Sequence, residues 1–131
     1  MKNFTFLLAL VAILAICLPC HAGEINEQDF NFRTTQDLGD LCSVDPASSS
    51  NIPAIYACRA FIEATVQYHD AVSDKKNLKR LICYGPEATI EDGRKVFVEW
   101  VATHKNDKNL MEEIPVVGMV RALAHKYPCP Q

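Results

Sequence analysis

Four cysteines, all of them beyond the first 22 residues, constrain this fold more than any other feature of the chain. They are Cys42, Cys58, Cys83 and Cys129. None belongs to a Cys-x-x-Cys pair and no His-x-x-x-His accompanies them, so a zinc site is not expected. In a short exported chain, four cysteines favour two disulfides, which allow three different pairings.

The first 22 residues predict a secretory signal peptide. Residues 1–3 carry one positive charge, residues 4–18 are nearly all apolar, and residues 19–22 break the run and end in Ala22. This order is typical of a signal cleaved after a small residue. An apolar run of about 15 residues is also short for a membrane span, which needs about 20. We therefore expect an exported protein with no membrane span.

Lipidation of Cys17 or Cys20 is an alternative, but a lipid-attachment site has a small residue before the cysteine, and Ile16 and Pro19 fit poorly. Cleavage after residue 22 leaves a single small domain, residues 23–131. Without Lys2 it carries 12 basic and 16 acidic residues, a net charge of −4. An acidic domain of this kind argues against nucleic-acid binding.

The mature chain predicts an all-α fold, a small disulfide-stapled bundle of about four helices. A short first helix is expected from Thr34 or Thr35, either of which can cap it, to about Cys42. A longer second helix is expected from Asn51, as its cap, to residues 73–77. Its apolar side chains recur at three- and four-residue steps, which predicts one buried face: Ala54, Cys58, Phe61, Ile62, Thr65, Tyr68, His69 and Val72.

Two more helices are expected in the second half. Thr89 and Asp92 resemble a capping box that starts the third helix. Its buried face is expected to carry Ile90, Val96, Phe97, Trp100 and Val101, and its exposed face Glu91, Arg94, Lys95 and Glu99. The last helix starts before or after Pro115, and its expected apolar side chains are Val116, Val117, Val120, Leu123, Ala124 and Tyr127. Residues 78–83 fit either a helical turn or an extended stretch, and Phe30 and Phe32 are expected to dock as a short arm.

These helices narrow the choice of disulfide pairing. Cys42 ends the first expected helix and Cys58 lies early in the second, so a helical hairpin brings them together. Cys83 precedes the third helix and Cys129 follows the last, so a second hairpin does the same. We favour Cys42–Cys58 and Cys83–Cys129, which would each contribute about 3–4 kcal/mol in the chain-entropy model.

No catalytic, cofactor-binding or metal-ligating residue is expected. His69, His104 and His125 lie near the ends of expected helices, where a histidine interacts favourably with the helix dipole. No serine lies in a Gly-x-Ser-x-Gly turn. The neighbouring carboxylates of Glu91/Asp92 and Glu112/Glu113 point in different directions on a helix. The chain therefore looks like a protein that binds rather than an enzyme.

The segments around the cysteines resemble the Rap/Tai family of immunity proteins. The matching pieces are residues 35–42, residues 58–64, Cys83 with Pro86, and residues 116–130, which close on an aromatic-Pro-Cys-Pro sequence. The resemblance implies a periplasmic protein that binds and inhibits a peptidoglycan-amidase effector of a type VI secretion system. Such an effector is a papain-like Cys/His enzyme, and its inhibitor does no chemistry of its own.

For the contact surface we predict the connection between the third and fourth helices. It is polar, yet it carries two apolar side chains that suit a groove on the partner; alternatively, these two simply cover the core. The predicted contact residues are His104, Lys105, Asn106, Asp107, Leu110, Met111, Glu112 and Glu113. The sequence leaves a homodimer open, and also two other functions: a periplasmic stress or chaperone protein and a carrier of a small apolar ligand.

Overall fold

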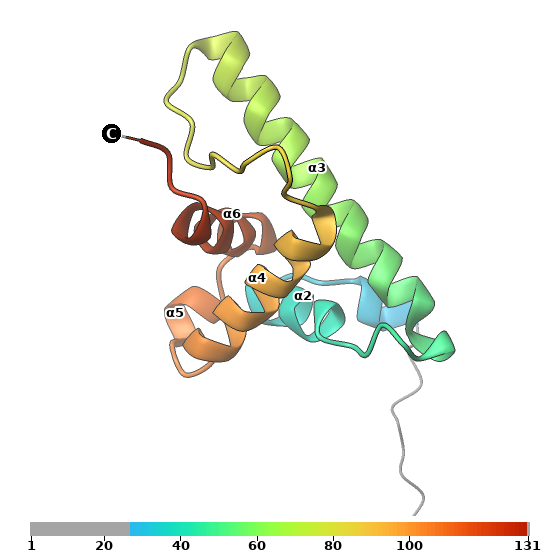
Figure 1. Cartoon of the computed structure of the whole chain (residues 1–131). Coiled ribbons are helices and arrows are strands. Elements are labelled where there is room, and N and C mark those ends of the chain that lie inside the picture. Colours follow the sequence, from blue (N-terminus) through green and yellow to red (C-terminus); the bar gives the residue numbers. More distant parts are fainter. Residues whose placement is uncertain (1–26, 131) are drawn as a thin grey trace, which may run out of the picture.

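The computed structural model describes residues 27–130, and the export signal predicted at residues 1–22 lies outside them. The elements are η1 (Glu27–Phe30), α2 (Thr35–Cys42), η2 (Ser49–Asn51), α3 (Ile52–Lys76), α4 (Ile90–His104), α5 (Lys108–Met111) and α6 (Pro115–Lys126) (Figure 1). Within this part of the chain no strand forms, and residues 78–83 are not helical. The all-α fold is thereby confirmed.

Two disulfides join the helices in the favoured pairing. Cys42 at the end of α2 is bonded to Cys58 in α3, 16 residues later. Cys83, in the segment between α3 and α4, is bonded to Cys129 after α6, 46 residues later. Beside the second disulfide, the backbone N–H of Cys83 donates to the Tyr127 carbonyl at 2.8 Å. The second disulfide therefore ties the end of the chain to the segment that leads into α4.

Two capping boxes start α2 and α4. The Thr34 hydroxyl accepts from the backbone N–H of Asp37, whose carboxylate accepts from the backbone of Thr34. Thr89 and Asp92 make the same pair of bonds, as predicted. Asn51 stands at the predicted N-cap position of α3, but its side chain makes no cap bond. A 3-10 turn leads into α3, and Asn51 already has helical backbone angles rather than the extended ones that a capping side chain needs.

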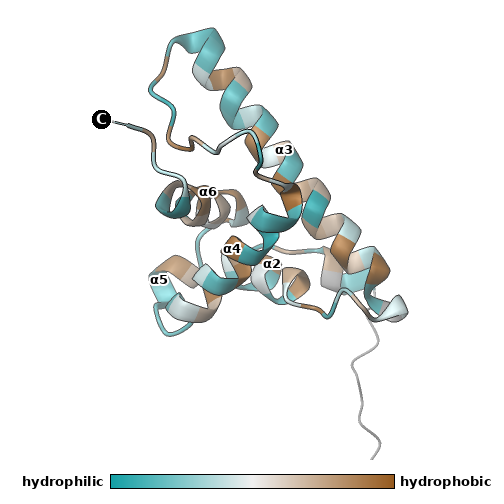
Figure 2. Cartoon of the chain, viewed as in Figure 1, coloured by the Kyte–Doolittle hydropathy of each residue, from teal (hydrophilic) through white to brown (hydrophobic). Residues whose placement is uncertain are grey.

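The core lies where α2 packs between α3, α4 and α6. Figure 1 shows the long α3 running past α4 and α2, with its C-terminal end standing clear of the other helices. In Figure 2 that end is mainly hydrophilic. Phe32 packs edge-on against Phe61, which docks the predicted arm. The fully buried side chains include Leu38, Cys42, Cys58, Ile62, Ile82, Phe97 and Met119.

The helix faces predicted from periodicity need three corrections, and the first two concern single residues. Tyr68 is 71% exposed, because it projects to the side of the buried stripe that Ala54, Cys58, Ile62 and Thr65 form. Arg94, expected on the solvent face of α4, is buried. Its Nη1 donates to the Cys42 carbonyl at 2.6 Å, where α2 ends with carbonyls that lack intrahelical partners.

The third correction concerns α6, which buries Pro115, Gly118, Met119, Ala122 and Leu123. Of the predicted face only Leu123 is among these residues. Helix α6 approaches α2 through its smallest residue, since a Cβ at Gly118 would meet the side chain of Thr35. This close approach turns the valines of α6 partly outward, and Val116 is 38% exposed.

The carboxylate of Glu91 makes the stability of the bundle depend on pH. It accepts three hydrogen bonds of 2.8–3.1 Å from the guanidinium of Arg94. These bonds and the positive charge of Arg94 outweigh burial and lower the pKa of Glu91. A carboxylate with a lowered pKa stabilises the fold above its unfolded-state pKa, and this stabilisation is lost as the pH falls through the folded-state value.

We expect Glu91→Gln to lower the free energy of unfolding by about 1–2 kcal/mol at pH 7, because a charge-assisted partner of a buried arginine is lost. The deficit relative to wild type should shrink as the pH falls below the ordinary glutamate pKa, since wild-type Glu91 is then protonated too. Urea unfolding at pH 7, 5 and 3 measures this. Glu99→Gln, at an exposed position of the same helix, is the control, and a deficit that did not change with pH would contradict the role of Glu91.

Candidate partner-binding surface

The predicted contact segment, residues 104–113, runs from the end of α4 through α5 and is held rigidly. The ring of His104 stacks on Trp100 with centroids 4.5 Å apart, and its Nδ1 lies 2.7 Å from the Trp100 carbonyl. The carboxylate of Asp107 caps α5 by accepting from the backbone of Asn109 and Leu110. At the far end, the Glu113 carbonyl accepts from the backbone N–H of Thr35 at 2.8 Å.

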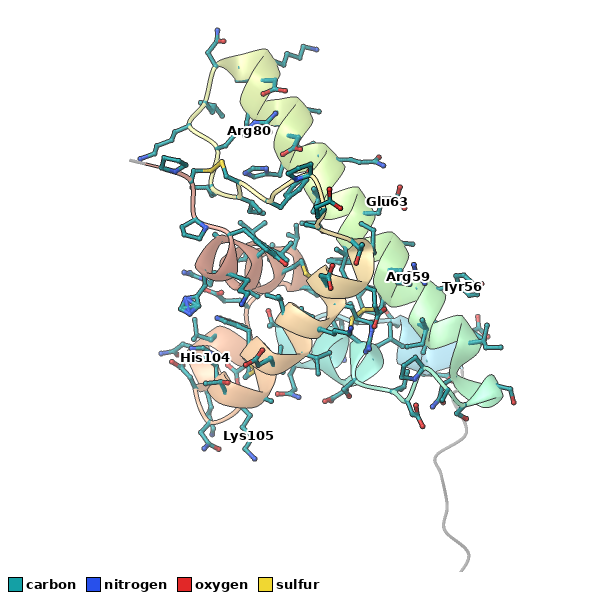
Figure 3. All side chains as sticks on the ribbon, in the orientation of Figure 1. Tyr56, Arg59, Glu63, Arg80, His104 and Lys105 are labelled. Carbon is teal, nitrogen blue, oxygen red and sulfur yellow. A yellow bond between two sulfur atoms is a disulfide. The ribbon has the colours of Figure 1, made fainter. Side chains whose placement is uncertain are left out.

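The exposed part of this segment is polar. Lys105, Asn106, Asp107 and Glu112 are exposed. In Figure 3 Lys105 points away from the bundle. The two apolar residues are placed differently, since Met111 is 5% exposed and belongs to the core, and Leu110 is half-buried against that core. Glu113 forms an ion pair with Arg121, with a shortest distance of 2.7 Å. The structure thus brings four of the eight predicted residues fully to the surface.

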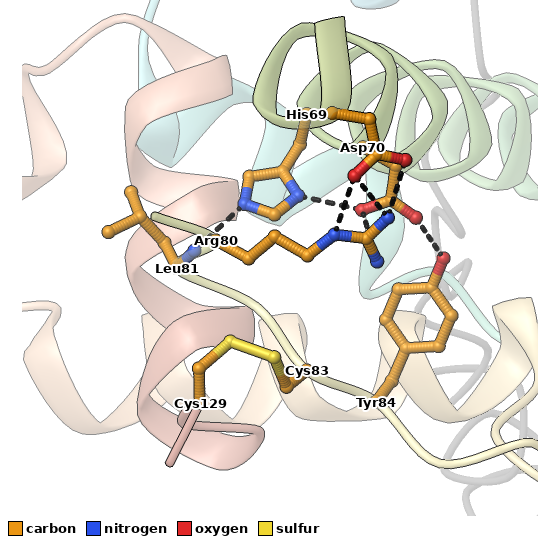
Figure 4. A network of polar contacts seen from close by, with 8 residues as sticks. His69, Asp70, Arg80, Leu81, Cys83, Tyr84 and Cys129 are labelled. Atoms are coloured by element: carbon orange, nitrogen blue, oxygen red, sulfur yellow. Dashed lines mark hydrogen bonds and ion pairs between the residues drawn. A yellow bond between two sulfur atoms is a disulfide. The ribbon is translucent and has the colours of Figure 1, made fainter. Parts of the chain in front are cut away.

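A network of polar contacts fixes the segment that follows α3, and Figure 4 shows it from close by. The side chain of His69, only 8% exposed, accepts the backbone N–H of Leu81 with Nε2 at 3.0 Å. Its Nδ1 lies 2.9 Å from the Asp70 carboxylate, whose other oxygen accepts from the Tyr84 hydroxyl at 2.7 Å. His69 thus has a specific structural role, which replaces the interaction with the helix dipole expected from the sequence.

In this network one guanidinium, that of Arg80, faces two carboxylates. Arg80 donates to both carboxylate oxygens of Asp74 at 2.8 Å and lies 3.7 Å from Asp70. Burial alone would raise the pKa of Asp70, but hydrogen bonds from Tyr84 and His69, with the positive charge of Arg80, outweigh it and lower that pKa. Both ring nitrogens of His69 are engaged. We therefore assign this cluster to holding the loop rather than to chemistry.

A second exposed surface, which periodicity did not single out, lies along α3 between Tyr56 and Glu63. Tyr56 is 67% exposed, Arg59 and Glu63 are exposed as well, and Figure 3 labels all three along α3. Glu63 also lines the groove between α3 and the start of α4. Tyrosine and arginine are enriched at the centres of protein interfaces. The sequence did contain a signal for this surface: Tyr56, Arg59 and Glu63 are spaced three and four residues apart, which places them on one helix face.

Among the described residues, no group of three or more histidine, cysteine, aspartate or glutamate side chains is placed to hold a metal ion. Within residues 27–130, no helix is both long and apolar enough to cross a membrane. The surface features described so far are a capped polar turn, an exposed helix face and a loop fixed by hydrogen bonds.

The family model of the Rap1a immunity proteins matches residues 34–129. The chain belongs to the Rap1a immunity protein family. The match begins at the capping residue of α2 and ends at the last cysteine of the second disulfide, so it spans both crosslinks and helices α2 to α6. No curated protein and no solved structure matches the chain significantly.

Membership identifies this Rap1a chain as an immunity protein for a secreted effector, and it confirms the resemblance found in the sequence. The described features suit that role, because a preorganised contact surface loses little conformational entropy when a partner binds. In the Rap1a chain the two disulfides, the capped α5 turn and the network at His69 hold such surfaces in place.

Proposed function

We propose that this Rap1a protein binds and inhibits a peptidoglycan-amidase effector of a type VI secretion system in the periplasm, without catalysing a reaction. The observation that carries the proposal is the family match over residues 34–129. Two disulfides support an oxidising compartment outside the cytoplasm, and the sequence of residues 1–22 supports export to it.

The contact surface that we propose is the exposed part of residues 104–113. It is a polar turn held by α5 capping and by the bonds between residues 113 and 35, so little conformational entropy is lost on binding. Lys105 and Glu112 are exposed, and the structure gives neither of them an ion-pair partner within the part of the chain that it describes. Both are therefore available to charged groups on the amidase.

The role of a small-ligand carrier is less well supported. A mainly apolar groove between α3, α4 and α6 has a volume of about 240 Å³, and its lining includes Ile62, Val66, Ile82 and Leu123. Pockets for small molecules usually measure about 300–1,000 Å³. The groove is therefore small for a carrier.

The proposal is tested by rescue of cells from lysis. Each amidase of a panel of type VI effectors is exported to the periplasm of a test strain, with and without the full-length Rap1a chain. We expect one amidase to be neutralised, and its binding by the purified protein to be measurable by calorimetry. A version lacking residues 1–22 stays in the cytoplasm and should give no protection. Failure to bind or neutralise any amidase would refute the proposal.

The contact surface is tested in the same system by a charge swap that leaves net charge unchanged. Lys105→Glu combined with Glu112→Lys is expected to weaken amidase binding at least tenfold. The matched control is Lys95→Glu with Glu99→Lys, an exposed pair on α4. Equal affinity of both swaps would show that residues 104–113 are not the contact. Met111 is unsuitable for this test, because a charge at a buried core position destabilises the fold.

A further inference from the structure

The side of α6 that turns away from the core carries apolar side chains around the exposed Arg121. Val120 and Ala124 are half-buried, and Ile114, just before the helix, is 59% exposed. Figure 2 shows little hydrophilic colour on α6 before its C-terminal end. Apolar side chains gathered on an exposed helix face can mark a surface that contacts another molecule. This face of α6 is therefore a candidate for burial against another molecule.

This face borders an open depression of about 520 Å³, which we call the α6 depression. Side chains from four separate parts of the chain line it. Its lining is Leu81, Trp100, Leu110, Val120, Arg121, Ala124 and His125, which includes five apolar residues, two basic ones and no acidic one. It shares Leu110 with the predicted contact segment, so the two surfaces are continuous.

The rim of the α6 depression is preorganised. Leu81 is 56% exposed, but its backbone is held by the Nε2 of His69. Arg121 donates to the Glu113 carboxylate through Nε and Nη2. Its Nη1 is left available to a further acceptor. An apolar side chain on a backbone that is already fixed loses less entropy on binding than one on a mobile loop, which favours a role as an anchor.

We propose that the α6 depression receives an apolar side chain of the effector, from a segment that carries a carboxylate beside it. The inference rests on the proposed function. It names the chemistry of the effector at the α6 depression, which adjoins the proposed contact segment, residues 104–113. Charge complementarity supports it, because the lining holds the guanidinium of Arg121, whose Nη1 is not used by Glu113, and no carboxylate. A second copy of this chain fits less well, since in a two-fold contact the facing depression would offer Arg121 no carboxylate.

Two leucines of the same loop allow a matched test. Leu78 and Leu81 are each 56% exposed, but only Leu81 lines the α6 depression. We expect Leu81→Asp to weaken binding of the neutralised amidase about 30-fold or more, the size of a central contact residue. Leu78→Asp should leave the affinity within twofold of wild type. Calorimetry measures affinity, circular dichroism with thermal unfolding checks the fold, and light scattering gives the oligomeric state.

The outcomes separate the inference from the function on which it rests. If wild type binds the amidase and Leu81→Asp binds equally well, or if both leucine variants lose affinity equally, the inference is overturned and the proposed function stands. If Leu81→Asp changes only the oligomeric state, the occupant is a second copy and the inference is again overturned. If wild type binds no amidase of the panel, both fail. Should Leu81→Asp unfold, Leu81→Ser replaces it, with Leu78→Ser as its control.

Discussion

A variant in which alanine replaces both Cys83 and Cys129 is expected to lose about 4 kcal/mol of unfolding free energy. The disulfide closes a loop of 46 residues. In the chain-entropy model, removing it raises the conformational entropy of the unfolded chain, which stabilises the unfolded state by about 4 kcal/mol. A small domain is stable by only about 5–15 kcal/mol, so the variant should be partly unfolded at 37 °C. Urea unfolding followed by circular dichroism, under non-reducing conditions, measures the change.

The other disulfide supplies the control. Cys42 and Cys58 are 16 residues apart, so their replacement by alanine should lower stability by about 3 kcal/mol, less than the longer loop. The alanine pair at positions 42 and 58 also leaves Arg94 its carbonyl partner, because that acceptor is backbone. The chain-entropy explanation would be contradicted if either cysteine pair cost less than about 1 kcal/mol of unfolding free energy. It would also be contradicted if the shorter loop cost more than the longer one.

Gly118→Ala is expected to lower stability by about 3 kcal/mol, at the upper end of the usual range for overpacking. A Cβ at Gly118 would overlap Cγ2 and Oγ1 of Thr35 and lie 2.8 Å from its Cβ. Thr35 has little freedom to move, since it is fully buried and its hydroxyl donates to the Glu113 carbonyl at 3.1 Å. Helix α6 must therefore shift away from α2. Thermal and urea unfolding measure the loss.

Two further variants test the cause of that loss. Gly85→Ala should be nearly neutral, because a Cβ there meets nothing within 4 Å and the backbone of Gly85 is not in the left-handed region. Thr35→Ala removes two of the three atoms in the way, so the double variant with Gly118→Ala should lose less than the sum of the single losses. Simple additivity would mean that Thr35 is not what excludes the alanine.

Local signals in the sequence predicted much of this fold. The capping box at Thr89 and the end of α2 at a cysteine depend on neighbours a few residues apart, which a single chain displays. The disulfide pairing followed from the same helix ends. Arg94 was misplaced because its acceptor, the Cys42 carbonyl, lies 52 residues away and belongs to another helix. Periodicity alone does not identify a buried cation whose partner is distant in sequence.

The candidate surfaces were less predictable, for a related reason. A row of valines in α6 indicates an apolar face but not which of two apolar faces is buried, and the contact of Gly118 with Thr35 decides this. Likewise, Leu110 and Met111 are adjacent in sequence, yet only Met111 belongs to the core. Whether an apolar side chain lies inside or at a rim depends on the helices packed around it.

The order of the crosslinks along the chain has a mechanical consequence. The disulfides close two separate covalent rings, residues 42–58 and residues 83–129, which do not overlap. A protease that cuts once inside either ring leaves both pieces joined through sulfur. One cut in residues 59–82, which include the exposed end of α3 and the loop after it, divides the molecule. Resistance of the intact molecule to a single nick therefore depends on that uncrosslinked stretch, which the bonds of His69 and Arg80 hold in place.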